Sequence, residues 1–334
     1  MVTATPAPQG CSAVPSTAVG GVADATGSYT VHFTLSQAAT MGNAPDMPLG
    51  FSPDGRWLAL ATREGVTLYD GKTLSPRLSC PFPIGVLSLA FAPNSASLTV
   101  GGVTVDAVTW HLPGGELANV ATLASPGIQR IAYAPDGTNF AVARSGVVSL
   151  FRSGDSRPTW TIEAPRGNIG DMEFSVDGQT IVVADTGVND PHETTAMTVR
   201  WLSVTDGGIR EQRTGPIAYR IAVSPDRRFL ARWRGSDAAL ELVPLDDTSA
   251  TPSYKFYPAK RVTVVGFVAE GSLLAAGDEE GGITLRNLGN GQPTQRLTIH
   301  TGAVSNLASS PDGTLIASAS PDGVVRLTPV SLWR

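Results

Sequence analysis

The stretch HTGAVSNLASSPDGTLIASASPDGVVRL, residues 300–327, decides the fold. Three segments in and around it alternate apolar and polar side chains with period two, which is typical of half-buried β-strands. These segments are 303–309, 314–320 and 324–330. The tripeptide Pro-Asp-Gly separates them twice: Pro fixes φ, the Asp side chain bonds the backbone two residues on, and Gly accepts positive φ. The stretch therefore predicts three strands joined by two tight turns.

The same pattern recurs through the chain in seven copies that align without gaps. The copies are FSPDGRWLALA from Phe51, FAPNSASLTVG from Phe91, YAPDGTNFAVA from Tyr133, FSVDGQTIVVA from Phe174, VSPDRRFLARW from Val223, FVAEGSLLAAG from Phe267 and SSPDGTLIASA from Ser309. Successive copies lie 40, 42, 41, 49, 44 and 42 residues apart. Each interval holds an apolar strand, a turn and three further strands, and seven four-stranded units of this length predict a β-propeller. The acidic residue of six copies, and Asn94 in the second, are explained by capping of their own turns.

The two ends of the chain predict how the ring closes. The chain stops after three strands of the seventh unit, while SYTVHFTL at 28–35 precedes the first unit as a lone strand. We therefore expect an all-β, seven-bladed β-propeller over residues 28–334, closed by the N-terminal strand, which completes the last blade and leaves no open sheet edge. Residues 1–27 consist almost only of Ala, Thr, Pro, Gly, Ser and Val, and we expect a tail or linker with little surface to bury.

Composition narrows the classes of partner. The chain has 24 Lys and Arg against 29 Asp and Glu, a net charge of -5, so it lacks the positive excess that holds polyphosphate, and nucleic acid is not an expected partner. No apolar run approaches the roughly 20 residues of a membrane helix, so no transmembrane span is expected. Arg outnumbers Lys strongly, a bias typical of high-GC bacterial genomes. The compartment stays open, because the N-terminal segment suits an extracytoplasmic linker and an interdomain spacer equally.

The two cysteines, Cys11 and Cys80, are too few for a disulfide scaffold and lack the paired spacing of a zinc site. An extended chain between Cys11 and the first predicted strand spans roughly 55 Å at about 3.3 Å per residue, which is enough for Cys11 to reach Cys80. A disulfide and two unrelated thiols both remain open. PQGC at 8–11 also looks like a lipoprotein cleavage site, without the apolar region that should precede it.

Residues 300–327 resemble a WD repeat from its His to its third strand, and the resemblance covers residues 28–334. The family's Trp at the end of the third strand is matched by Trp110 and Trp201, although the Trp-Asp dipeptide itself is nowhere intact. The resemblance implies that His300 and Asp322 hydrogen-bond within the last blade. Because the copies are degenerate, related propellers of the Tol-B-like and lactonase types are alternatives.

The sequence contains no complete catalytic motif. There is no GxSxG elbow, DGKT at 70–73 lies between two predicted strands rather than before a helix, and PHETT at 191–195 lacks the second His of a zinc protease. We therefore predict no catalytic, cofactor-binding or metal residues, and the sequence favours a non-enzyme.

One loop departs from the repeat. The fourth interval stretches to 49 residues because the connection ADTGVNDPHETTAM, 184–197, is long, and insertions in repeat proteins collect on one face. A propeller places this loop on the same face as the fourth-to-first-strand connections. The predicted partner-binding residues on that face are Asp190, His192, Glu193, Arg166, Lys260, Arg261, Arg144 and Arg234. Their mixed signs suit protein or peptide recognition; for the long loop, a metal site and an ordinary solvated loop are alternatives.

The sequence thus predicts a non-catalytic interaction platform that binds protein or peptide partners through its loop-bearing top face, alone or within a larger complex. The alternative is a propeller enzyme or small-ligand binder, lactonase-like or quinoprotein-like, acting at the mouth of the central channel. Neither the partner nor the oligomeric state is specified by the sequence.

Overall fold

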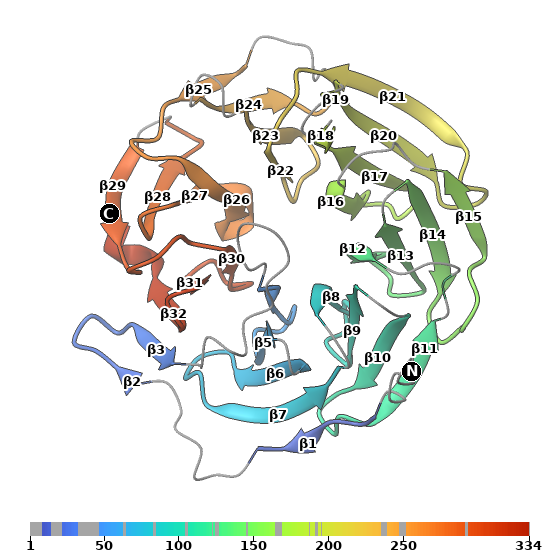
Figure 1. The fold of residues 1–334 in the computed structure, drawn as a ribbon, viewed down its shortest axis with the longest axis horizontal. Helices are drawn as coiled ribbons and strands as arrows, with labels where there is room; N and C mark the ends of the chain where they lie inside the picture. Colours follow the sequence, from blue (N-terminus) through green and yellow to red (C-terminus); the bar gives the residue numbers. More distant parts are fainter. Residues whose placement is uncertain are drawn as a thin grey trace.

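The computed structural model is a ring of seven antiparallel β-sheets around a central channel (Figure 1). It confirms the all-β, seven-bladed propeller. The structure describes residues 9–14, 22–32, 47–62, 65–82, 85–103, 106–121, 123, 127–144, 146–163, 169–186, 188–190, 193–194, 196–234, 239–246, 252–290 and 293–333. The strands of the repeat follow chain order outward from the channel in each blade, so the first strand of each blade lines it, and strands from the N-terminal segment are added on the outside of blades seven and one.

The first four blades follow the repeat from Leu49 to Gly215. Blade one comprises β4 (Leu49–Phe51), β5 (Trp57–Thr62), β6 (Gly65–Asp70) and β7 (Pro76–Pro81). Blade two comprises β8 (Val86–Phe91), β9 (Ser97–Gly102), β10 (Ala107–His111) and β11 (Leu117–Ala121). Blade three comprises β12 (Ile128–Tyr133), β13 (Asn139–Arg144), β14 (Val147–Arg152) and β15 (Trp160–Glu163). Blade four comprises β16 (Ile169–Phe174), β17 (Thr180–Asp185), β20 (Met197–Ser203) and β21 (Ile209–Gly215), with a separate hairpin of β18 (Val188–Asp190) and β19 (Glu193–Thr194).

The last three blades use both ends of the chain. Blade five comprises β22 (Arg220–Val223), β23 (Phe229–Trp233), β24 (Leu240–Pro244) and β25 (Tyr254–Phe256). Blade six comprises β26 (Val262–Val268), the 3-10 helix η2 (Ala269–Gly271), β27 (Leu273–Asp278), β28 (Gly282–Asn287) and β29 (Pro293–Thr298). Blade seven comprises β30 (Asn306–Ser309), β31 (Leu315–Ser320), β32 (Val324–Pro329), the 3-10 helix η3 (Val330–Trp333) and, from the N-terminal segment, β3 (Tyr29–His32).

Acidic side chains cap the turns between the first and second strands. In blade seven, Asp312 Oδ1 accepts hydrogen bonds from Ser310 Oγ at 2.6 Å and from Thr314 N at 3.1 Å. These bonds hold the pKa of Asp312 below its ordinary value. The following Gly313 has a φ of 67°, a conformation that side chains with a Cβ rarely adopt. The turn chemistry of the Pro-Asp-Gly motif therefore operates as the sequence predicts.

Seven apolar clusters hold the blades together, one between each pair of neighbours. The cluster between blades three and four, for example, joins Ala141 and Leu150 to Met172 and Phe174, all at most 2% exposed. The alternation of each strand supplies these clusters, because its apolar side chains point to the sheet faces that adjacent blades bury against each other. No blade can bury both of its faces without two neighbours.

The N-terminal strand closes the ring, as predicted. Tyr29, Thr30, Val31 and His32 of β3 pair antiparallel with Leu327, Arg326, Val325 and Val324 of β32. Val31 is 8% exposed and belongs to the apolar cluster between blades seven and one. A further short strand, β2 (Val22–Ala23), pairs with β3 on its outer side.

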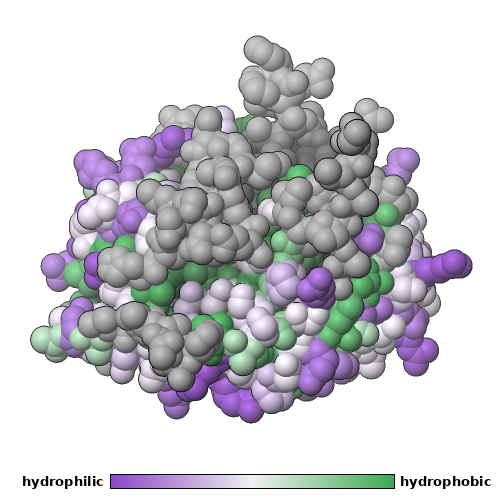
Figure 2. All heavy atoms as spheres, turned by 60° about the horizontal axis from the view of Figure 1, so that its bottom comes forward, coloured by the Kyte–Doolittle hydropathy of each residue, from purple (hydrophilic) through white to green (hydrophobic). Residues whose placement is uncertain are grey.

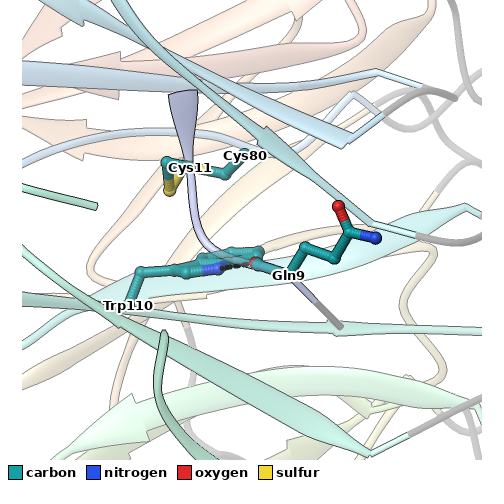
Figure 3. The surroundings of a disulfide bond; sticks show 4 residues. All are labelled: Gln9, Cys11, Cys80 and Trp110. Carbon is teal, nitrogen blue, oxygen red and sulfur yellow. Dashed lines mark hydrogen bonds between the residues drawn. A yellow bond between two sulfur atoms is a disulfide. The ribbon is translucent and has the colours of Figure 1, made fainter. Parts of the chain in front are cut away.

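Residues 9–14 form a strap along the outside of blades one and two. Strand β1 (Ser12–Ala13) pairs with β7 as a fifth strand of blade one (Figure 1). Cys11 is disulfide-bonded to Cys80, and the indole Nε1 of buried Trp110 donates to Gln9 O at 2.8 Å (Figure 3). Cys11 N also donates to Gly115 O at 2.7 Å. The question of the cysteines, open from the sequence, is answered in favour of the bond, and this strap makes more contacts than its composition predicts.

Deleting residues 1–36 should abolish cooperative unfolding. The deletion removes β3 and exposes the apolar faces of blades seven and one at the same time. Differential scanning calorimetry should show broad or multiple transitions in place of one. Cys11→Ser is the control, since it retains β3 and should keep a single transition. A deletion variant that melts like the full chain would show that β3 does not close the ring.

Breaking the disulfide alone should lower stability without opening the ring. The bond closes a loop with a sequence separation of 69 residues, and a loop of this size is worth about 2–4 kcal/mol, or about 3–6 °C in Tm for a chain this long. Cys11→Ser should therefore melt several degrees lower. Reductant should lower the Tm of the wild type to that of the variant and leave the variant unchanged. Equal melting of both proteins without reductant would contradict the bond.

Candidate functional site

Two sets of connections share one face of the ring, which we call the top face. They are the turns between the second and third strands and the connections from the fourth strand to the next blade. Contacts join the two sets: Glu279 N donates to Arg261 O at 3.1 Å, and Thr301 N donates to Asp322 Oδ2 at 2.9 Å. The opposite, bottom face carries the turns between the first and second strands, such as residues 311–313 of blade seven. In Figure 2, hydrophilic and hydrophobic residues are interspersed over the described part of the visible surface.

At the top of blade seven, a buried histidine links the connection to the second and third strands. His300 is 3% exposed; its Nδ1 donates to Asp322 Oδ2 at 3.1 Å, and its Nε2 accepts from Ser318 Oγ at 2.8 Å. Burial lowers the pKa of His300 from its ordinary value, although the Asp322 carboxylate opposes this. A neutral imidazole with its proton on Nδ1 fits both partners. This network confirms the hydrogen bond that the resemblance implies for His300 and Asp322.

Blade six has a different network at the same height. Asp278, at the end of β27, receives two hydrogen bonds from the guanidinium of Arg296, one at 2.7 Å and one at 2.9 Å. This pairing raises the pKa of Arg296 above its ordinary value. Above it, Lys260 Nζ lies 2.6 Å from Glu280 Oε1, and both side chains are exposed. Blade six thus carries a part-buried ion pair and an exposed one.

Blade five gathers three cations around one carboxylate. Glu241 on β24 is 2% exposed and bonds at 2.8 Å with Arg232 Nε, whose side chain is 3% exposed. Arg234 Nη1 and Lys255 Nζ lie 3.7 Å and 3.3 Å from the other oxygen of Glu241 and are partly exposed. Arg232 occupies the place of Ser318 in blade seven, since each pairs with the second residue of its inner strand. The same repeat position is therefore cationic in blade five and uncharged in blade seven.

The central channel has a volume of about 780 Å³ and is lined by the inner strands of all seven blades. The inner strands of adjacent blades belong to different sheets. Polar side chains of the channel link these strands. The links join Ser88 Oγ to Ile131 N, Gln129 Oε1 to Ile169 N, Arg130 to Gly170 O, Asp171 Oδ2 to Val223 N, Arg220 to Thr263 O, and Thr263 Oγ1 to Val304 O. These six contacts span the blade boundaries from two to seven.

Two carboxyl groups of β16 share the channel side of blade four. Asp171 Oδ1 and Oδ2 accept from Met172 N and Val223 N, and Glu173 Oε2 lies 3.0 Å from Arg227 Nη2. Glu173 lines the channel, and 40% of its side chain is accessible. Burial and the nearby Asp171 raise the pKa of Glu173 to about 7, against the opposing effect of Arg227. Burial also raises the pKa of Asp171.

Arg227 stands where five of the other six copies have glycine, and it keeps the glycine-like φ of 60°. Its guanidinium reaches blade four, where Nε donates to Phe174 O at 2.8 Å and Nη2 contacts Glu173. A side chain that bridges two blades offsets the cost of the left-handed backbone.

The residues predicted to bind a partner fall into three groups. Lys260 and Arg261 are exposed on the top face, and Arg234 is partly exposed there beside Glu241. Arg144 is at the top of blade three but only 5% exposed. Asp190 and Glu193 are paired in the β18–β19 hairpin, whose side chains lie outside the described part, as do Arg166 and His192 altogether. The structure therefore brings Arg234, Lys260 and Arg261 to one surface.

Sequence reasoning missed Asp171, Glu173 and Glu241. A signal was present for the first two, because IGDMEF places them two residues apart and hence on one side of a strand. Among the residues that the structure describes, no three His, Cys, Asp or Glu side chains gather in a group that could hold a metal ion. Within the same residues, no helix has the length and apolarity to cross a membrane.

Comparison with known proteins gives two similarities. The family model described as WD domain, G-beta repeat, matches residues 291–328, a range that includes His300, Ser318 and Asp322. Over 109 residues the chain is 34% identical to WD repeat-containing protein SL1-17 of Schistosoma mansoni. That alignment covers 33% of this chain and 35% of the relative, so the shared part is about a third of each protein.

The free energy of unfolding should fall less steeply with rising pH in Glu173→Gln than in the wild type. The folded protein keeps Glu173 protonated up to about pH 7, whereas the ordinary pKa is 4.5, so folding binds a proton between these values. The free energy of unfolding therefore falls as pH rises through this window. Glutamine mimics the protonated acid, so the Tm of the variant relative to wild type should rise by about 1–3 °C between pH 4.5 and 8, after allowance for solvent screening.

The control is Glu163→Gln, which changes an exposed carboxylate on the outer strand of blade three. Its Tm relative to wild type should stay constant over the same pH range. A Glu173→Gln variant with a constant difference from wild type would show that this carboxyl does not titrate in the window.

Proposed function

We propose that this WD-repeat-like seven-bladed β-propeller is a non-catalytic interaction platform that binds a protein or peptide partner through its top face. The observation that carries the proposal is the non-repeating surface of a repeating scaffold. At the top of blades five, six and seven, the same repeat position holds Arg234, Asp278 and Ser320, and the neutral His300 network lies beside the last of these. Exposed charges of both signs lie above them, among them Lys260, Arg261 and Glu280. Such a mixed pattern supports selective recognition of one partner orientation.

Two further observations support this function. Propellers with WD repeats generally serve as scaffolds for protein interactions, and the matched repeat lies in blade seven beside this surface. The polar groups of the channel are engaged between blades, which leaves the top face as the richer source of exposed charged groups. The Cys11–Cys80 bond supports a location in an oxidising compartment, where such bonds persist.

A small ligand in the channel is the second candidate. A volume of about 780 Å³ lies within the range of small-molecule sites, and Asp171 and Glu173 offer two carboxyl groups. Both groups already contact blade five, however, so a ligand would have to compete with Val223 N and Arg227. This competition favours the top face.

The lysines provide an internal test of which face is used. The chain has three, of which Lys255 and Lys260 are at the top and Lys72 lies in the β6–β7 turn at the bottom. A lysine-reactive crosslinker applied to the protein with its co-purifying partner should therefore give links from Lys255 and Lys260. Acetylation by a soluble reagent should be slowed at these lysines by the partner and unchanged at Lys72. Links and protection confined to Lys72 would place the partner on the bottom face and refute the proposal.

A further inference from the structure

The top of blade five carries two exposed aromatic rings. Tyr219 directly precedes the inner strand β22, and Tyr257 directly follows the outer strand β25. They are 44% and 66% exposed. Some large hydrophobic side chains of the described residues are exposed, and these two are the aromatic ones among them. Because β22 begins and β25 ends at the top face, the two rings mark the inner and outer ends of this blade's upper edge.

A continuous row of contacts joins the two rings. The Tyr219 ring lies 6.0 Å from the ring of Trp233, which adjoins Arg234 in sequence. Arg234 and Lys255 both approach Glu241, and Lys255 Nζ lies 5.8 Å from the centre of the Tyr257 ring. We call Tyr219, Arg220, Arg234, Lys255 and Tyr257 the blade-five stripe. The stripe crosses four strands, about 14 Å at about 4.8 Å per interval.

The charge of the stripe is positive, in contrast to the net charge of -5 of the whole chain. Glu241 is buried with Arg232, and that pair is neutral. Arg234 and Lys255 add two positive charges beside it, and Arg220, which donates to Thr263 O and Tyr219 O, adds a third at the inner end of the stripe. Asp237, in the adjoining loop outside the described residues, brings the carboxylates to two against four cations. Counting every one of these groups, the stripe still carries an excess of positive charge.

This chemistry specifies a class of partner. Tyr and Arg are enriched at the energetic centres of protein interfaces, because they combine a broad contact surface with hydrogen bonding. Clustered cations recognise carboxylates. The indole Nε1 of Trp233, 6% exposed beneath the stripe, has no hydrogen-bond partner among the described residues.

Building on the proposed function, we propose that the blade-five stripe binds an acidic segment of the partner protein. An extended stretch of about five residues spans the stripe at about 3.3 Å per residue. Its carboxylates lie against Arg220, Arg234 and Lys255, and its aromatic or large apolar side chains pack on Tyr219 and Tyr257. Nucleic acid would meet the same cations, but the acidic remainder of the chain opposes a polyphosphate.

The test uses the full chain and three labelled probes. The probes are the peptide Gly-Glu-Phe-Glu-Glu-Phe-Glu-Gly, the same peptide with Gln in place of every Glu, and a twelve-residue single strand of thymidylate. The stripe variants are Tyr257→Ala and Lys255→Gln. Their matched controls are Val176→Ala, which trims a 72% exposed side chain in a bottom turn, and Lys72→Gln, which removes a bottom-face charge. The Tm of each variant confirms that it is folded.

The Glu peptide should bind, with an affinity that falls as salt is added. The Gln peptide should bind at least tenfold more weakly, each stripe variant should weaken the Glu peptide at least fivefold, and the two controls should match wild type. The inference is overturned if the Glu peptide does not bind, if the Gln peptide binds equally well, if the stripe variants bind like wild type, or if the thymidylate strand binds more tightly. If these outcomes occur while the natural partner still crosslinks to Lys255 or Lys260, the stripe is wrong and the top-face function stands.

Discussion

The pairing of β3 with β32 is the constraint on which the rest of the structure depends. Each blade buries its two faces only against its neighbours, so six of the seven apolar clusters form between segments that follow one another along the chain. The seventh joins Val31 and Leu327, from opposite ends of the sequence, to Leu58 of blade one. Without the pairing, this cluster would be exposed on two blades at once, and each remaining blade boundary would lose the constraint of a closed ring.

Around the channel, hydrogen bonds from side chains connect the inner strands of adjacent blades. Inner strands of adjacent blades diverge too far to form a common sheet, and groups such as Arg130, Asp171 and Thr263 span the gap by binding a backbone atom of the next blade. These polar groups would suggest a binding site if they were considered one by one. Their partners show that they join the blades, which separates the structural chemistry at the axis from the exposed charges of the top face.

The repeat made blade number, turn capping and ring closure predictable, because each depends on residues close in sequence or on the count of strands. Contacts between the side chains of different strands were not predictable. Nothing in FLARWRG signals that Arg232 will be buried against Glu241, since the pairing depends on the register of two strands separated by a variable loop. For the same reason Arg144, predicted as a surface contact, is only 5% exposed. The contacts of the N-terminal segment were underestimated. Its composition indicates a small apolar content, whereas the strap is held by backbone hydrogen bonds and one disulfide.

That strap also determines how the molecule carries mechanical load. The covalent loop from Cys11 to Cys80 passes through β3 in blade seven and then through blade one, so it encloses the boundary where the ring closes. Tension applied upstream of Cys11 is transmitted through sulfur directly to β7 and leaves the hydrogen bonds between β3 and β32 unloaded. A tether attached at this end can therefore be pulled without peeling the closing strand from the ring, whereas in the reduced protein the same force would load the hydrogen bonds of the strap and then the four residue pairs of β3 and β32.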